Sequence, residues 1–332
     1  MAINFEQVVD FTPLLQLQPT QPTLLASLGL FDVRHEPTTM VAVGRDVANN
    51  ALIPARNRAG ERNWSTRGDV SRQVFEIPFF PLVHNITAQD IQSLRSYGAV
   101  GFTDELRTQE EVVNRYMQQI RINQAFTKEA IYSSAVRGFA YNGTGGSVNG
   151  NYDWYDVWGQ TQQTITIDFS SSTIDPSEVI DAQGRAYIED NKQDGSLATR
   201  IFCLCGRSFF SALIHNAFLR SAYQFYQGTP NPLRDRIGGD LDVQIFEFEG
   251  VTYMTDPHGF IAENEGYLFP QGVPGMFQSF YAPADDVNYA NTVAQEGYVF
   301  MTTEGRNLKL ETEFSLLAVN NRPELVIKLI AA

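Results

Sequence analysis

Residues 108–138 read TQEEVVNRYMQQIRINQAFTKEAIYSSAVRG and predict one long α-helix, around which the remaining chain is organised. Thr108 and Glu111 have the spacing of a capping box, in which each side chain bonds the free backbone N–H of the other residue. Arg137 and Gly138 provide the expected C-terminal stop. The residues of one, mainly apolar, face recur at three- and four-residue steps, and they are Val112, Val113, Tyr116, Met117, Ile120, Gln124, Ala125 and Ile131. Such a helix would be ~45 Å long, so its single apolar face requires an extended surface to lie on.

The length and composition of the chain indicate a folded protein with more than one compact unit. It has 332 residues, so we expect two domains or one domain with long excursions. Hydrophobic residues make up 43% and aromatic residues 12%, which is enough for a proper core. The net charge of −14 argues against a general nucleic-acid-binding protein. No apolar run has membrane-spanning length and no signal-peptide pattern is visible, so we expect neither membrane insertion nor export.

Residues 1–37 predict an extended N-terminal arm. Prolines at positions 13, 19, 22 and 37 interrupt any long helix. Apolar residues between them would anchor the arm: Phe5, Val8, Val9, Phe11, Leu14, Leu15 and Leu17. An apolar arm with so little regular structure requires another protein surface to cover its apolar side chains. Its support is either its own domain or a neighbouring subunit.

Residues 38–83 predict a long two-stranded excursion. Alternating segments, TTMVAV and RQVFEIPFF, form its two ends. Positions 45 to 72 contain six arginines and three acidic residues, so this segment has a net charge of +3. Because the whole chain has a net charge of −14, the remainder has a net charge of −17. An isolated hairpin is marginally stable in water, whereas an acidic surface would steady it, so we expect self-association through complementary charge. A solvated hairpin and a phosphate-binding loop are the alternatives, although no glycine-rich cradle precedes a helix here.

The rest of the chain predicts shorter elements. We expect a short helix and a turn in 84–103, an aromatic-rich hairpin in 139–160 and a strand in 162–170. Asp175 is a predicted helix N-cap, with Pro176 at the first helical position. A buried strand at 201–206 precedes one amphipathic helix at 207–228. Two strands joined by a tight turn at Glu249-Gly250 follow, and two more strands close the chain.

Side chains suited to catalysis or metal binding are few and scattered. Cys203 and Cys205 are the only cysteines; two apart in a strand, they are badly placed for a disulfide. Without nearby histidines they also make a poor zinc site, so we expect buried thiols. A turn explains the Asp256–His258 pair better than catalysis does. No known catalytic or cofactor motif is visible, and we expect no catalytic, cofactor-binding or metal site.

The order of these parts resembles the major capsid proteins of tailed bacteriophages, and more narrowly the lambda-like major capsid protein E family. Five stretches carry the resemblance, and together they span nearly the whole chain. They are RNWSTRGDVSRQVFEIPFFPLVHNITAQDIQSLR (62–95), EEVVNRYMQQIRINQAFTKEAIYSSAVRG (110–138), IFCLCGRSFFSALI (201–214), EFEGVTYMTD (247–256) and NNRPELVIKLIAA (320–332). The resemblance implies an α+β, Hong Kong 97-like fold. It also implies a protein that assembles into hexamers and pentamers of an icosahedral head around double-stranded DNA.

The resemblance also implies a division of the chain. Residues 1–37 would be the N-arm, and 38–83 the extended E-loop that lies over an adjacent subunit. Residues 84–170 and 296–318 would form the peripheral domain, with 108–138 as its spine helix. Residues 171–295 and 319–332 would form the axial domain, which packs around the centre of the capsomer.

Two differences from some relatives bear on partners. The arm begins near Met1, so we expect scaffolding to come from a separate protein. The region 38–83 contains no lysine, so a covalent isopeptide cross-link cannot form from this loop. The other partners implied are a cement or decoration protein, a portal, and packaged DNA held without sequence-specific binding. The expected location is the virion capsid, after assembly in the host cytoplasm.

The residues expected at subunit contacts are arginines, aromatic residues and apolar anchors, which are typical interface hot spots. In the E-loop they are Arg56, Arg58, Arg62, Trp64, Arg67 and Arg72, and in the N-arm Phe5, Phe11, Leu14 and Leu15. Three alternatives remain at this point. An encapsulin compartment shell shares the fold. A carbohydrate-binding or tail-associated module is suggested by Trp154, Tyr155 and Trp158. An enzyme would require acidic residues gathered around His215 or His258.

Overall fold

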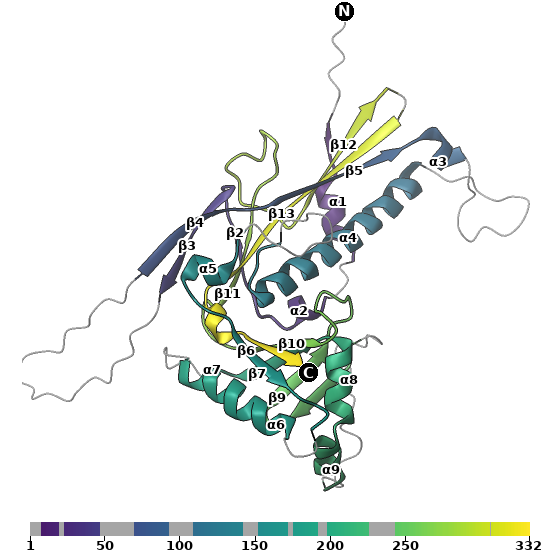
Figure 1. Cartoon of the computed structure of the whole chain (residues 1–332). Coiled ribbons are helices and arrows are strands. Elements are labelled where there is room, and N and C mark those ends of the chain that lie inside the picture. Colours follow the sequence, from purple (N-terminus) through teal and green to yellow (C-terminus); the bar gives the residue numbers. More distant parts are fainter. Residues whose placement is uncertain are drawn as a thin grey trace, which may run out of the picture.

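The computed structural model describes residues 8–19, 23–46, 70–92, 109–141, 152–171, 175–191, 198–225, 243–305 and 307–332. These residues form two six-stranded sheets and a separate two-stranded sheet, together with helices on their faces. The first sheet and the longest helix make one part of the molecule, and the second sheet with its helices makes the other (Figure 1). The α+β class expected from the sequence is confirmed.

The first sheet is built on one long strand, β13 (Asn307–Asn320), which pairs with three others. Its strand order is β1-β12-β13-β11-β2, and β5 pairs with β13 outside this path. The three partners of β13 are β5 (Phe79–Ile86), β11 (Phe277–Tyr281) and β12 (Tyr298–Glu304), while β1 (Val9–Asp10) pairs with β12 and β2 (Asp32–His35) pairs with β11. All pairs are antiparallel except β2 with β11.

Helix α4 (Gln109–Arg137) lies across this sheet and contacts β13 (Figure 1). The predicted helix is thus confirmed, while Thr108 of the expected capping box lies outside the described residues. Its N-terminal half packs with Leu15, Ile86 and Leu310, and its C-terminal half joins the core between the two sheets. The buried face contains Val112, Val113, Met117, Ile120, Ala125, Ala130, Ile131, Tyr132, Ala135 and Val136. The extended surface that the helix required is therefore the first sheet.

The second sheet has the order β6-β14-β10-β7-β9-β8. Its strands are β6 (Gln163–Ile167), β7 (Arg200–Cys205), β8 (Ile245–Phe248), β9 (Val251–Thr255), β10 (Glu265–Gln271) and β14 (Ile327–Ala331). Along β7, Phe202 and Leu204 enter the core shared with α4, whereas Cys203 and Cys205 enter the core on the opposite face. Both cysteines are free and buried, as predicted.

The remaining helices are short. They are α1 (Thr12–Leu17), α2 (Leu24–Ser27), α3 (Ala88–Gln92), α5 (Trp154–Trp158), α6 (Pro176–Val179), a π-helix (Ile180–Arg185), α7 (Ala186–Asn191), α8 (Arg207–His215), α9 (Ala217–Phe225) and a 3-10 helix (Pro323–Leu325). Asp175 caps α6 as predicted, accepting a hydrogen bond from the Ser177 backbone N–H. Within the described ranges, no helix combines the length and apolar character needed to cross a membrane.

Two local predictions are wrong. The single helix expected at 207–228 is broken at Asn216, which has an extended backbone and accepts a hydrogen bond from the Phe218 N–H. Asparagine side chains favour this capping role, so a new helix begins after it. The aromatic segment expected as a strand of a hairpin instead forms α5, because Asp153 caps the Tyr155 N–H. Residues 142–151, where the turn was expected, lie outside the description.

Two strand pairings join segments that the expected division of the chain places in different domains, and that division stays a prediction. Strand β6 was assigned to the peripheral part but pairs with β14 in the second sheet. Strand β11 was assigned to the axial part but pairs with β13 in the first sheet. Both differences come from pairings between segments far apart in the chain, which local sequence patterns do not reveal. The chain passes several times between the two parts as a result.

Candidate assembly interface

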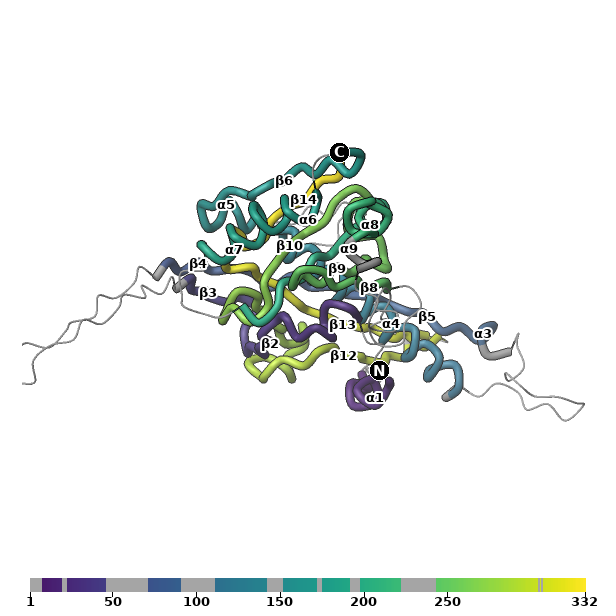
Figure 2. Tube along the Cα trace, turned by 90° about the horizontal axis from the view of Figure 1, so that it is seen from below, coloured from purple at the N-terminus to yellow at the C-terminus, as the bar shows by residue number. Residues whose placement is uncertain are grey.

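The hairpin of β3 (Met40–Asp46) and β4 (Val70–Glu76) projects from one end of the molecule, and α3 lies at the opposite end (Figure 2). The two strands pair antiparallel from Met40–Glu76 to Asp46–Val70, as the sequence predicted. One face of the hairpin packs on α5, where the Phe75 ring meets Trp154 edge-on at 5.2 Å between ring centroids. Val41, Val43 and Ile77 belong to the same cluster. The hairpin is therefore fixed to its own subunit by one face.

The opposite face of the hairpin is open to solvent. Met40, Ala42 and Val74 are exposed there, and Val74 has 61% of its surface accessible. Arg72 is also exposed, directly across from Gly44. An apolar strip beside a cation is typical of a surface that a partner covers.

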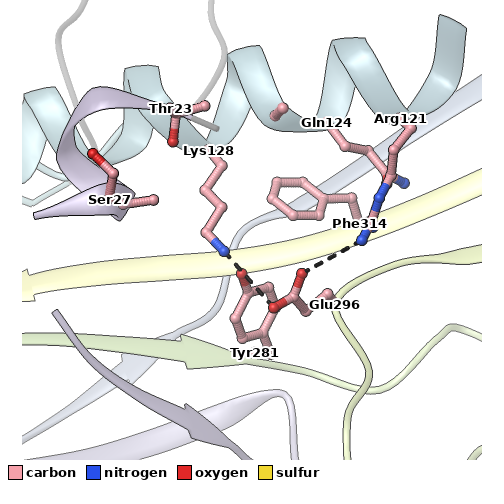
Figure 3. A pocket seen from close by; sticks show the side chains of 10 residues that line it. Thr23, Ser27, Arg121, Gln124, Lys128, Tyr281, Glu296 and Phe314 are labelled. Atoms are coloured by element: carbon pink, nitrogen blue, oxygen red, sulfur yellow. Dashed lines mark ion pairs between the residues drawn. The ribbon is translucent and has the colours of Figure 1, made fainter. Parts of the chain in front are cut away.

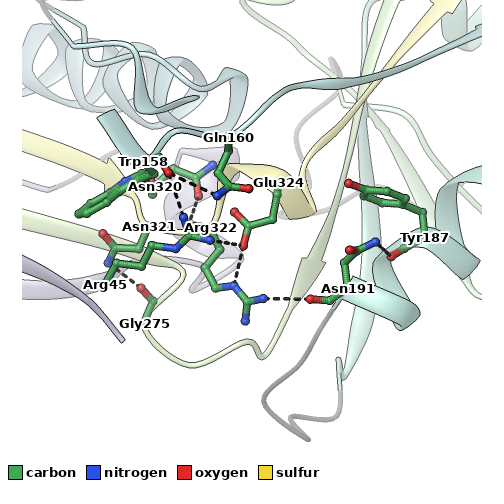
Figure 4. A network of polar contacts seen from close by, with 10 residues as sticks. All are labelled: Arg45, Trp158, Gln160, Tyr187, Asn191, Gly275, Asn320, Asn321, Arg322 and Glu324. Carbon is green, nitrogen blue, oxygen red and sulfur yellow. Dashed lines mark hydrogen bonds and ion pairs between the residues drawn. The ribbon is translucent and has the colours of Figure 1, made fainter. Parts of the chain in front are cut away.

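A buried network holds the C-terminal end of β3 (Figure 4). The Arg45 Nη2 lies 2.9 Å from Glu324 Oε1, and the Nη1 donates to the Trp158 carbonyl at 3.3 Å. Arg322 Nε approaches the same Glu324 oxygen at 3.0 Å, and its Nη2 donates to the Asn191 carbonyl. One carboxylate is thus shared by a hairpin arginine and a C-terminal arginine. Composition alone grouped Arg45 with the arginines of the tip, and no local signal separates it from them.

Most of the predicted E-loop contact residues fall outside the described part of the chain. These are Arg56, Arg58, Arg62, Trp64 and Arg67. Arg72 is described, and its exposed side chain is available to a neighbour. The assignment of all six residues to subunit contacts stays a prediction.

The described N-arm lies largely on its own subunit. Strand β1 pairs with β12 at the edge of the first sheet, and the Tyr289 hydroxyl donates to the Asp10 carboxylate. Leu15 is fully buried against α4, and Phe11 packs beside it. For Leu15 the expected inter-subunit contact is therefore corrected, because its own subunit encloses the whole side chain. Leu14 points away, with 44% of its surface exposed, and Phe5 lies outside the described residues.

The structure also describes residues of two alternatives that the sequence raised. Trp154, Tyr155 and Trp158 are buried, so they offer no open aromatic platform for a sugar. Asp256 accepts hydrogen bonds from the backbone N–H groups of His258 and Ile261, which makes this pair a turn, as expected. In the described ranges, no group of three or more His, Cys, Asp or Glu side chains could hold a metal ion.

The sequence matches a family profile and two characterised relatives. The profile is described as phage major capsid protein E and matches residues 7–331. The chain is 28% identical to the major capsid protein of Pseudomonas phage KPP10, over 98% of this chain and 96% of the relative. It is 26% identical to the major capsid protein of Salmonella phage Felix O1, over 96% and 95% of the two chains.

Solved structures with a similar fold include phage capsid chains. A capsid chain of cyanophage P-SCSP1u superposes with a TM-score of 0.54 at 10% identity, covering 95% of this chain and 90% of that one. A mature capsid chain of bacteriophage PhiM1 gives 0.51 at 11% identity, covering 95% and 89%. The Hong Kong 97-like fold is thereby confirmed. With the profile match across nearly the whole sequence, the chain belongs to the phage major capsid protein E family.

Proposed function

We propose that this chain self-assembles into hexamers and pentamers of an icosahedral tailed-phage head that encloses the double-stranded DNA genome. The observation that carries the proposal is the projecting β3–β4 hairpin, whose outer face leaves Val74 and Arg72 uncovered. A folded subunit gains nothing by itself from an exposed apolar strip on an extended hairpin. A shell in which each hairpin lies over the next subunit would bury it.

Assembly would rest on many weak contacts. The arginine-rich tip, with Arg56, Arg58, Arg62 and Arg67, would lie on an acidic surface of the next subunit, and Trp64 would add an apolar anchor. Each exposed ion pair contributes only ~0–1 kcal/mol. Multiplicity in a closed shell makes the total sufficient, because each additional contact forms at high effective concentration.

Other exposed apolar groups extend the proposed contact surface. Leu14 and Leu17 on α1 and Val8 beside β1 line the described arm. Phe79 and Val83 are exposed on β5, the strand that follows the hairpin in the chain. Contacts at both places would let a subunit meet more than one neighbour, as closed shells require.

The chain would act as a structural component rather than as an enzyme. Its other proposed partners are a separate scaffolding protein, a portal and a decoration or cement protein. The net charge of −14 would prevent tight binding of packaged DNA to the inner surface of the shell, because both are negatively charged. Because 38–83 lacks lysine, the shell would be held by burial, strand pairing and charge, and not by an isopeptide from this loop. Assembly would occur in the host cytoplasm and the product would be the virion capsid.

Charge reversal in the loop tests this proposal. The double variant Arg58→Glu, Arg62→Glu should yield folded subunits that form no shells in negative-stain microscopy. The matched control is Arg207→Glu, Arg220→Glu, which makes the same charge change at exposed positions of α8 and α9. Normal particles from the loop variant would refute the placement of the loop on a neighbour. Loss of particles in both variants would assign the effect to total charge instead.

A further inference from the structure

A cavity of about 270 Å³ lies between α2, α4, β13 and the segment that precedes β12 (Figure 3). Arg121, Gln124 and Lys128 enter it from α4, Phe314 from β13, and Glu296 from the preceding segment. One liquid water occupies about 30 Å³, so the space exceeds that of a few waters. None of the interactions described above uses this cavity.

The cavity contains more positive than negative charge. Arg121 and Lys128 have only 12% and 20% of their side-chain surface exposed. Their shared counter-ion is Glu296, which is 46% exposed and lies 3.9 Å from Arg121 and 3.8 Å from Lys128. These separations exceed hydrogen-bond length, so Glu296 is a loose and displaceable partner. Burial lowers the pKa of Lys128, and the opposing effect of Glu296 is smaller. The pocket is therefore short of negative charge.

Two of the residues that line the pocket, Arg121 and Gln124, carry buried polar atoms without partners among the described residues. The Nε of Arg121 and both amide atoms of Gln124, Nε2 and Oε1, are buried and have no hydrogen-bond partner among the described residues. Buried polar atoms are nearly always satisfied, so such a cluster indicates a missing ligand or ordered water. Two unpaired donors and one ammonium require acceptor oxygens, while the Gln124 oxygen requires one donor.

We propose that Arg121, Gln124 and Lys128 form a binding site for a small oxyanion, of the hydrogen phosphate or carboxylate type, which displaces Glu296. Oxygens of the anion accept from Arg121 Nε, Gln124 Nε2 and the Lys128 ammonium. The remaining O–H of a hydrogen phosphate, or a bound water, donates to Gln124 Oε1. Charge-assisted hydrogen bonds of this kind are about twice as strong as neutral ones. The anion is either free in solution or the carboxylate of an acidic side chain from a second copy of this chain.

Calorimetric titration of the purified full-length chain with inorganic phosphate, at constant ionic strength, tests the site. Wild type should bind one phosphate per chain, and Arg121→Gln should weaken binding about tenfold. Lys128→Gln is a second variant should Arg121→Gln fail to fold. Arg115→Gln, on the exposed side of the same helix, makes the same charge change and should bind as wild type does.

Glu296→Gln gives the sharpest result. Removal of a competing carboxylate should tighten phosphate binding about fivefold, whereas the exposed Glu76→Gln control should not. No phosphate binding by wild type, or no gain in Glu296→Gln, overturns the proposal. In assembled shells, retained phosphate binding identifies a free oxyanion as the ligand. Loss of binding only on assembly identifies a carboxylate of the second copy.

Discussion

Arg45 of the β3–β4 hairpin and Glu324 of the C-terminal 3-10 helix form a 2.9 Å ion pair, although 279 residues separate them. Both side chains are nearly buried, and Glu324 also binds Arg322. The 3-10 helix leads directly into β14 of the second sheet. The ion pair therefore ties the direction of the hairpin to the C-terminal segment that leads into the second sheet. If the hairpin makes the proposed subunit contact, its outer face would be oriented before a neighbour binds.

Arg45→Met should destabilise the subunit by about 2 kcal/mol. Removal of one partner from a buried pair costs more than an exposed pair contributes, because the remaining charge stays buried. Glu324 retains Arg322 at 3.0 Å, which limits the loss. Chemical denaturation of the unassembled subunit measures the change. Arg72→Met, an exposed arginine on the same hairpin, is the control and should change the unfolding free energy by less than about 0.5 kcal/mol. Equal effects of the two variants would contradict the anchoring role.

Trp154→Ala should cost about 3–5 kcal/mol of unfolding free energy. Its side chain is fully buried and packs against Phe75 and Tyr152, so truncation leaves a cavity beneath the hairpin. Phe126→Ala, at a half-exposed position of α4, should cost clearly less. A near-neutral Trp154→Ala that weakens binding to a glycan array would restore the carbohydrate-binding interpretation.

Glu129 should make stability depend on pH. Burial raises the pKa of this carboxyl from 4.5 to about 7, while the Leu25 backbone N–H donates to it and partly opposes the rise. Between these two values the folded state holds a proton that the unfolded state releases. Stability contributed by the group is therefore complete below about pH 4.5 and is lost as the pH rises through about 7. The loss should amount to about 3 kcal/mol at most.

The variant Glu129→Gln isolates this effect. Its amide oxygen can still accept from Leu25, but it does not titrate. The difference in unfolding free energy between wild type and variant should fall steadily from about pH 5 to pH 8. A difference that stays constant over this range would show that Glu129 is ionised throughout.

Gly138→Ala should destabilise the end of α4 by about 2–4 kcal/mol. Gly138 has a φ of 100°, and an added Cβ would lie 2.2 Å from Tyr155 Cε2. Gly259→Ala is the matched control: φ is 75°, but nothing lies within 4 Å of the added Cβ, so only conformational strain remains. The thermal midpoints of the two variants give the comparison, and a milder effect at 138 than at 259 would contradict close packing there.

Elements with a strong local signal could be predicted from the sequence. Apolar periodicity identified α4, alternation identified β3 and β4, and a short apolar run identified β7 as a buried strand. The predicted tight turn at Glu249-Gly250 is confirmed: β8 and β9 pair antiparallel on either side of it, and its two residues have positive φ of 49° and 77°, as two-residue hairpin turns often do. The break at Asn216 was not visible, because apolar periodicity continues on both sides of it. Its capping role depends on the orientation of one side chain.

Features made by distant segments could not be predicted. The burial of Leu15 depends on how α1 meets α4, and the separate role of Arg45 depends on Glu324. The pocket likewise requires Glu296 to approach Arg121 and Lys128. In each case the local sequence pattern shows the chemical character of the residue but not the distant residue that it contacts.

Shell formation by the unmodified chain tests the central claim most directly. The full-length chain is produced with and without the scaffolding protein of the same phage, and the products are examined by negative-stain microscopy. The account predicts closed shells or sheets of hexamers in at least one of the two conditions. A stable, soluble monomer in both conditions would contradict it.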